Sequence, residues 1–133
     1  MTQALTFACP DIDEDIPRYL WGDRNKLRQI LVNLLSNAVK FTDEGSITLK
    51  VWSHVDDAYH LYFQVTDTGI GIAQEEIPTL FEPFQQAESG RKSGSGTGLG
   101  LSITNEFVTM MDGNITIESE LDVGTTFTIF LPF

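Results

Sequence analysis

Residues 23–42 form the stretch that most limits how this chain can fold. Apolar residues recur there every three to four positions, as they do along the buried side of an α-helix. The pattern predicts a helix from about Arg24 to Phe41, with Asp23 as its N-cap. At about 100° per residue, three polar side chains fall on one edge of that buried side: Asn33, Asn37 and Lys40. Taken alone, this edge could also be the solvated side of an ordinary amphipathic helix.

A second group of polar and glycine residues follows a strand-like run. Apolar and polar residues alternate from 61 to 66, and the run ends at Asp67, followed by Gly69 and Gly71. Glycine allows a sharp turn and the close approach of a flat ligand. A carboxylate beside it could accept a charge-assisted hydrogen bond from an exocyclic amine, worth about 1.5–3 kcal/mol. An Asx-type turn after a strand explains Asp67 equally well if this group stands alone.

A glycine-rich segment precedes a third apolar pattern. Five of the 11 glycines lie between residues 90 and 100, directly before the helix-like spacing of Leu99, Ile103 and Phe107. Because the glycines stop where that pattern begins, a flexible linker is disfavoured, and N–H groups at the helix start could bind phosphates. A Walker A loop is excluded because no glycine precedes a lysine. The G-x-G-x-x-G spacing fails as well, since its last position is Leu99 or Leu101.

Together these segments resemble the ATP-binding catalytic domain of sensor histidine kinases, in the superfamily that also includes gyrase, Hsp90 and MutL. Residues 27–42 resemble its N box and residues 67–71 its G1 box. Residues 81–86 resemble the F box and residues 96–101 the G2 box, in the same order along the chain. The match, over about residues 23–131, implies a Bergerat-type α+β fold. This is a two-layer α/β sandwich whose mixed, mostly antiparallel sheet carries helices on one face.

The resemblance implies that the ligand is ATP with Mg²⁺. Asn37 would ligate the metal through its side-chain oxygen, Asn33 would line the same region, and Lys40 would contact phosphate, so that these three serve catalysis. Asp67 would accept a hydrogen bond from the adenine amino group, and Gly71 would admit the ring. A lid over about residues 78–96 would cover the nucleotide. The other nucleotide-binding residues that the resemblance implies are Phe41, Gly69, Ile72, Phe84, Arg91, Lys92, Gly96, Thr97, Gly98, Leu99, Gly100 and Leu101.

Asn33 bears on which reaction the resemblance implies. In the gyrase, Hsp90 and MutL branches, the corresponding position carries a glutamate that activates water. An amide cannot serve as that general base, so hydrolysis should be slow and the γ-phosphoryl group should survive for transfer. The expected function is therefore that of a histidine kinase catalytic domain in a two-component phosphorelay. A nucleotide-sensing docking module without phosphotransfer and an ATP-hydrolysing relative of the Hsp90 or MutL type are the alternatives.

The phosphoacceptor histidine is not evident in this sequence. Neither of the two histidines, His54 and His60, begins the motif of the family's phosphoacceptor helix, and we expect ordinary strand or turn surface for both. Residues 1–133 are therefore expected to be one catalytic domain, without the helical dimerisation and phosphoacceptor domain and unable to phosphorylate itself. Its expected partners are that helical domain and, downstream, the receiver domain of a response regulator.

Charge and composition limit the other partners. A net charge of −11 argues against nucleic acid or an anionic membrane, so ATP must meet local positive charge. We interpret the basic group at Arg24, Lys26 and Arg28 as solvated helix surface, with a docking patch as the alternative. No apolar run approaches the roughly 18–20 residues of a membrane helix, and no signal peptide is recognisable. Together with a single cysteine, Cys9, this predicts a cytoplasmic location, free or as part of a membrane-bound sensor.

The remaining helices and strands are predicted from hydrophobic periodicity and turn residues. Strands are expected at 4–9 and 19–21, and a hairpin at 46–66 whose turn includes residues 56–58. A short helix is expected near 74–80 and a longer one over about 98–111, ended by Asp112 and Gly113. Two further strands are expected at 114–119 and 125–131.

Overall fold

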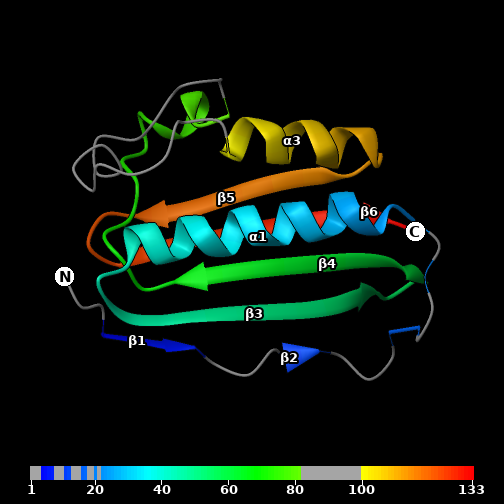
Figure 1. The fold of residues 1–133 in the computed structure, drawn as a ribbon, viewed down its shortest axis with the longest axis horizontal. Coiled ribbons are helices and arrows are strands. Elements are labelled where there is room, and N and C mark those ends of the chain that lie inside the picture. The colour runs from blue at the N-terminus through cyan, green and yellow to red at the C-terminus, as the bar shows by residue number, and fades with distance from the viewer. Residues whose placement is uncertain (1–3, 8–10, 13–15, 18–19, 21, 82–99) are drawn as a thin grey trace.

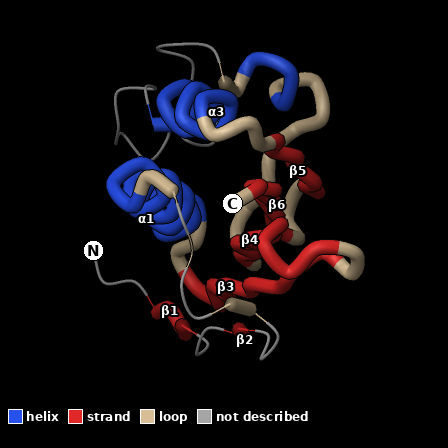
Figure 2. The backbone as a smooth tube through the Cα atoms, turned by 90° about the vertical axis from the view of Figure 1, so that its right-hand side faces the viewer, coloured by secondary structure: helices blue, strands red, loops and turns tan. Residues whose placement is uncertain are grey.

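The computed structural model describes residues 4–7, 11–12, 16–17, 20, 22–81 and 100–133. They form two layers, with a sheet on one side and two helices on the other (Figures 1 and 2). The helices are α1 (Arg24–Phe41) and α3 (Gly100–Met110), and a 3-10 turn, η1, covers Ile77–Thr79. The strands are β1 (Ala4–Phe7), β2 (Asp11–Ile12), β3 (Glu44–His54), β4 (Asp57–Asp67), β5 (Asn114–Glu120) and β6 (Gly124–Pro132).

The sheet is mixed and mostly antiparallel, as predicted. Its six strands run in the order β1-β3-β4-β6-β5, and β2 also pairs with β3. β1 and β2 run parallel to β3, whereas the β3–β4, β4–β6 and β5–β6 pairs are antiparallel. Figure 2 shows both helices on the same face of this sheet. The expected α+β two-layer sandwich is therefore confirmed.

Helix α1 has the bounds that its sequence predicts. Asp23 caps it, since its Oδ1 accepts a hydrogen bond from the Lys26 N–H at 3.0 Å. The helix ends at Phe41, where the backbone of Thr42 is already extended. Its buried residues lie three or four positions apart, as one face of a helix requires: Ile30, Leu34, Ala38 and Phe41.

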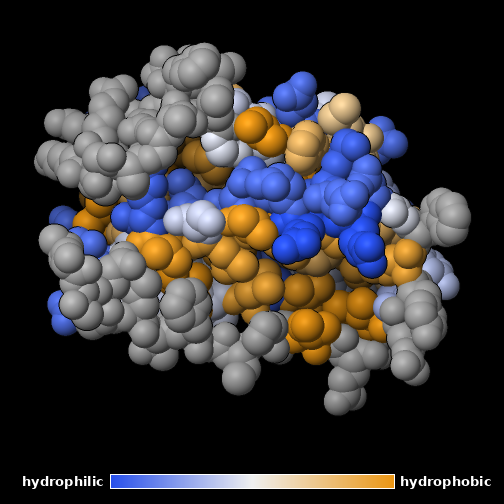
Figure 3. Space-filling model, in the orientation of Figure 1, coloured by the Kyte–Doolittle hydropathy of each residue, from blue (hydrophilic) through white to orange (hydrophobic). Residues whose placement is uncertain are grey.

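The core lies between α1 and the inner face of the sheet. From Leu61 in β4 and from Thr125 in β6, every second residue is buried, and the register places Phe63 opposite Ile129 and Val65 opposite Phe127. Each large apolar side chain removed from water in this way contributes about 1.5–3 kcal/mol. Figure 3 shows the helix side of the molecule, where a hydrophilic band follows the position of α1 with apolar side chains beside it.

The outer face of the sheet carries a row of aromatic side chains. The rings of Trp52 and Tyr62 are stacked, with centroids 5.2 Å apart, and Phe130 lies 5.2 Å from Tyr62 on the other side. Cross-strand aromatic pairs of this kind stabilise a sheet by roughly 0.2–1 kcal/mol each. This face points away from α1 and α3, so it contributes to stability and not to the region between the helices.

Several predicted boundaries differ from the structure. The first strand ends at Phe7 within the described residues, β2 has no counterpart among the predicted strands, and Leu20, in the predicted strand 19–21, is not in a strand. The hairpin starts at Glu44 and ends at Asp67, beyond the predicted 46–66, and its turn is confined to residues 55–56. Asp57 and Ala58, predicted in the turn, lie in β4. The expected short helix at 74–80 is a turn followed by η1, where Pro78 supplies no backbone N–H. Residues 98–99 of the expected second helix lie outside the described part.

Candidate functional site

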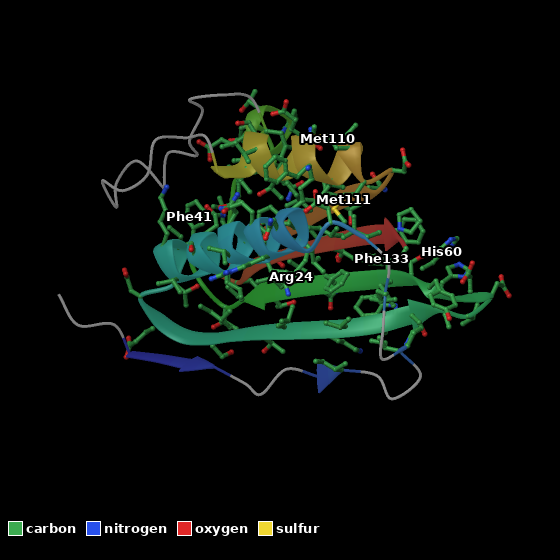
Figure 4. The ribbon with its side chains drawn as sticks, turned by 45° about the vertical axis from the view of Figure 1, so that its right-hand side comes forward. Arg24, Phe41, His60, Met110, Met111 and Phe133 are labelled. Carbon is green, nitrogen blue, oxygen red and sulfur yellow. The ribbon has the colours of Figure 1, made fainter. Side chains whose placement is uncertain are left out.

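The loop after β4 is docked on the last turn of α1. The Ile70 N–H donates to the Phe41 carbonyl at 3.2 Å. A Cβ atom added at Gly69 would lie 2.2 Å from that same carbonyl oxygen, so only glycine allows this approach. Phe41 itself is 5% exposed, and Figure 4 shows it at one end of the domain. The N box helix and the G1 loop therefore meet, as the resemblance implies.

Asp67 is a buried carboxylate at the end of β4. Its exposure is 4%, and its Oδ1 accepts a hydrogen bond from the Gly69 N–H at 2.9 Å. Burial raises the pKa of Asp67, while hydrogen bonds from the backbone of Gly69, the backbone of Thr125 and the side chain of Thr42 act in the opposite direction. No ion pair to this carboxylate is found among the described residues. A buried acceptor held in this way is suited to a neutral or weakly polar donor such as an exocyclic amine.

The packing of the loop after β4 requires glycine at position 71, which the sequence motif does not reveal. Its φ is +75°, and an added Cβ would lie 2.2 Å from the Glu120 carbonyl oxygen at the β5–β6 turn. The Asp122 N–H donates to the Ile70 carbonyl at 2.8 Å and holds the same contact. Ile72, the next residue, is 1% exposed and belongs to the core. The nucleotide-binding roles of Gly71 and Ile72 stay predictions beside these packing roles.

Asn33 joins α1 to the first turn of α3. Its Nδ2 donates to the Gly100 carbonyl and to Thr104 Oγ1, both at 3.2 Å, and its Oδ1 accepts from Gln29 Nε2 at 2.7 Å. Thr104 is fully buried, and its hydroxyl donates to the same Gly100 carbonyl at 2.8 Å. Asn33 thus places the N box helix against the helix that follows the glycine-rich segment, and its own amide is occupied in doing so.

Asn37 lies one helical turn beyond Asn33, on the same edge. Its Nδ2 is buried and has no hydrogen-bond partner among the described residues. A buried donor left unpaired costs about 1–3 kcal/mol, so this amide has capacity for a ligand. Lys40 Nζ lies 5.8 Å from the centroid of the Phe41 ring, and partial burial lowers the pKa of Lys40.

The polar groups are spread along α1 instead of gathering at one point. At about 1.5 Å per residue, Asn33 lies about 12 Å along the axis from Phe41, with Asn37 between them. A groove of about 580 Å³ continues from Asn33 along the α1–α3 contact and is lined by Asp23, Asn25, Lys26, Gln29, Asn33, Gly100, Ile103 and Phe107.

Seven predicted site residues lie outside the described residues: Phe84, Arg91, Lys92, Gly96, Thr97, Gly98 and Leu99. Most of the expected lid at 78–96 lies there too. Gly100 starts α3, and an added Cβ would meet no atom of the described residues within 4 Å. Leu101 packs against the core.

Some residues of the region were not among those predicted. Gln29 lies four residues before Asn33, which is the spacing of side-chain neighbours on a helix, so its contact could have been anticipated. Thr42, Thr104 and Thr125 carry no such local signal, because their partners are distant in the sequence.

Comparison with known proteins decides the family. Residues 22–133 match the family described as histidine kinase-, DNA gyrase B-, and HSP90-like ATPase. The chain belongs to this family. Within it, the chain is 45% identical over 122 residues to the sensor histidine kinase RcsC of Escherichia coli (strain K12), covering 91% of this chain. It is 50% identical over 113 residues to the circadian input-output histidine kinase CikA of Synechococcus elongatus, covering 84% of this chain.

Solved structures of histidine kinases share the fold. Full-length ShkA in complex with AMPPNP superposes with a TM-score of 0.82 at 33% identity, covering 97% of this chain and 26% of that protein. The mycobacterial sensor histidine kinase MprB gives a TM-score of 0.81 at 28% identity, covering 96% of this chain and 83% of that chain. The predicted resemblance to a histidine kinase ATP-binding catalytic domain is thus confirmed. The chain spans only 12% of the length of RcsC and 15% of that of CikA.

Two further findings bear on metal and membrane. Among the described residues, no group of three or more His, Cys, Asp or Glu side chains could hold a metal ion. In the same part of the chain, no helix is both long and apolar enough to cross a membrane.

Proposed function

We propose that this domain binds ATP with Mg²⁺ and donates the γ-phosphoryl group to a histidine on a separate helical dimerisation domain. One observation carries the proposal: the polar edge of α1 has hydrogen-bonding capacity left over where a nucleotide would lie. Asn37 Nδ2 is buried without a partner among the described residues, and it lies between Asn33 and Phe41 on one helix. That ShkA was solved with AMPPNP supports an adenine nucleotide as the ligand.

Each polar group on or beside α1 has a role in this proposal. Asp67 accepts from the adenine amino group at the Phe41 end, and Lys40 compensates phosphate charge. Asn37 supplies an amide oxygen to the metal, which suits Mg²⁺ because this ion keeps several waters and needs few protein ligands. The bound ion would neutralise charge on the phosphates. The first turn of α3 adds N–H groups and a favourable helix dipole at the other end.

The bonding of Asn33 favours phosphotransfer over hydrolysis. Its amide is engaged by Gly100, Thr104 and Gln29, and it has no basic group to activate water. Positioning and charge neutralisation then leave the γ-phosphoryl group available to an external nucleophile. The nucleotide-sensing module and the ATP-hydrolysing relative remain the competing functions that an assay must separate.

The acceptor histidine belongs to another domain in this proposal. His54 and His60 lie on β3 and β4, and Figure 4 shows His60 at the opposite end of the domain from Phe41. His60 Nε2 lies 3.4 Å from an Asp57 carboxylate oxygen, and the two imidazole rings are 6.5 Å apart. We therefore propose a helical phosphoacceptor domain as the partner, a response-regulator receiver domain downstream of it, and a cytoplasmic location where ATP is supplied.

Two measurements test the proposal. Calorimetry with a non-hydrolysable ATP analogue, with and without Mg²⁺, should show binding that the metal strengthens; no binding under either condition would refute it. Addition of ATP and the matched helical phosphoacceptor domain should give acid-labile phosphohistidine. Binding without transfer would favour the sensing module, and steady hydrolysis without any acceptor would favour the ATPase.

A further inference from the structure

Ser119, near the end of β5, makes a cluster of hydrogen bonds that the proposed function has not used. Its Oγ accepts from the Ile72 N–H at 2.7 Å. The same oxygen lies 3.0 Å from the Gly124 carbonyl oxygen and 2.8 Å from Thr125 Oγ1. In addition, the Ser119 carbonyl accepts from Gln74 Nε2 at 2.6 Å. One residue of β5 thus contacts both the chain after the G1 loop and the start of β6.

Only one assignment of donors and acceptors allows all three hydrogen bonds at Ser119 Oγ. A serine hydroxyl donates one hydrogen bond and accepts two. Its proton must go to the Gly124 carbonyl, because that oxygen can only accept. The two acceptor positions then receive the Ile72 N–H and the Thr125 O–H. Ser119 is therefore fully engaged, and it fixes the direction in which the Thr125 hydroxyl points.

Thr125 connects this cluster to the strand residue that carries the buried carboxylate. It pairs with Asp67 in the β4–β6 register, and Asp67 Oδ1 accepts from the Gly69 N–H. Ser119 therefore contacts both ends of the segment from Asp67 to Ile72, directly at Ile72 and, at the other end, through Thr125, the strand partner of Asp67. Asp67 and Ile72 are 4% and 1% exposed, so water cannot readily replace either attachment.

We propose that Ser119 is a positioning residue that sets the orientation of the Asp67 carboxylate and thereby the selectivity for a purine with a 6-amino group. The inference rests on the proposed function, because it assumes that Asp67 meets the base. Without the hydroxyl, the Ile72 N–H loses its acceptor and Thr125 loses the partner that orients it. The loop is then free to shift, and the carboxylate no longer meets the base at one defined angle.

The test compares Ser119→Ala with Ser119→Thr, which keeps a hydroxyl, and with Thr126→Ala. Thr126 is a matched control because its hydroxyl pairs with Thr66 Oγ1 at 3.3 Å on the outer face of the same sheet. Calorimetry of the whole chain with ATP and with ITP, which has an oxo group at that ring position, gives the affinity ratio for each variant. Hydrogen exchange of the residue 69–72 amides without nucleotide reports the loop directly.

We expect Ser119→Ala to weaken ATP binding by roughly fivefold, the effect of about 1 kcal/mol, with little change for ITP, so that the ratio falls. The Ile72 amide should exchange faster. Ser119→Thr should restore both readouts, and Thr126→Ala should leave both at wild-type values. A wild-type ratio and wild-type exchange in Ser119→Ala would overturn the role of Ser119 while leaving the proposed function intact. Failure of the wild-type chain to bind either nucleotide would overturn both.

Discussion

The Asp67→Asn substitution tests the site most directly, and the structure gives its expected size. A carboxylate offers about four acceptor positions, and the Gly69 N–H takes one of them at Asp67 Oδ1. In the proposed function, a ligand amine takes another. An asparagine oxygen offers only two acceptor positions, and its NH₂ group would face the remaining donors. The adenine amino group is the donor that can leave, so its bond is the one lost.

A lost charge-assisted hydrogen bond of about 1.5–3 kcal/mol weakens ATP binding by about tenfold to 150-fold. The side-chain NH₂ group that the substitution introduces could instead donate to the oxo group of ITP, so the preference for ATP over ITP should narrow or reverse. Calorimetry with both nucleotides in the presence of Mg²⁺ measures the two effects together.

Asp57→Asn is the matched control for this experiment. Asp57 Oδ1 accepts from the N–H of Tyr59, two residues on, at 2.9 Å, just as Asp67 accepts from Gly69. It lies at the other end of the same strand, so its substitution should leave both affinities unchanged. If Asp67→Asn binds ATP as tightly as the wild-type chain, Asp67 does not contact the base and the reasoning fails.

Further substitutions and pH test other parts of the structure. Asn37→Ala removes a buried donor whose unpaired state costs about 1–3 kcal/mol, so the unfolding free energy without nucleotide should not fall, whereas the strengthening of ATP binding by Mg²⁺ should disappear in calorimetry. Gly71→Ala, at φ +75° and against the Glu120 carbonyl, should lower the unfolding free energy in urea by at least about 1–3 kcal/mol. Leu34→Ala, at 0% exposure, should lower it by about 2–5 kcal/mol in the same assay. Burial raises the pKa of Asp67 above 3.8, so protonation of this carboxyl group favours the folded state. The resulting stabilisation is present below pH 3.8 and should be lost as the pH rises through the raised pKa. Urea unfolding of Asp67→Asn at a series of pH values should show no such loss.

The parts of the fold that were predictable from sequence are those set by local patterns. The bounds of α1 follow from apolar periodicity and an N-cap, and both act within a few residues. The two C-terminal strands follow from alternation and from the turn residues Asp112 and Gly113; in the structure α3 ends at Met110, and Asp112 has a φ of 60°. β2 was missed because two residues carry no period, and its pairing with β3 depends on where the chain returns.

The candidate site also has a part that local sequence patterns predict and a part that depends on how distant segments pack. That Asn33, Asn37 and Lys40 share one helix edge is a property of helical spacing, and the structure confirms the helix. That Asn33 bonds to Thr104 depends on how α3 packs on α1, which spacing alone does not determine. Gly71 shows the difference most clearly: the motif predicts room for a ligand, whereas the structure adds a close backbone contact with Glu120.

The double use of α1 limits how this domain can be altered. Its eighteen residues carry core side chains on one face and the polar edge on the neighbouring one, so a shift that relieves packing also displaces the amides. Thermostability and affinity are then difficult to improve independently through this helix. The aromatic row on the outer sheet face, at Trp52, Tyr62 and Phe130, is the better place to strengthen the domain without disturbing the proposed ligand contacts of α1.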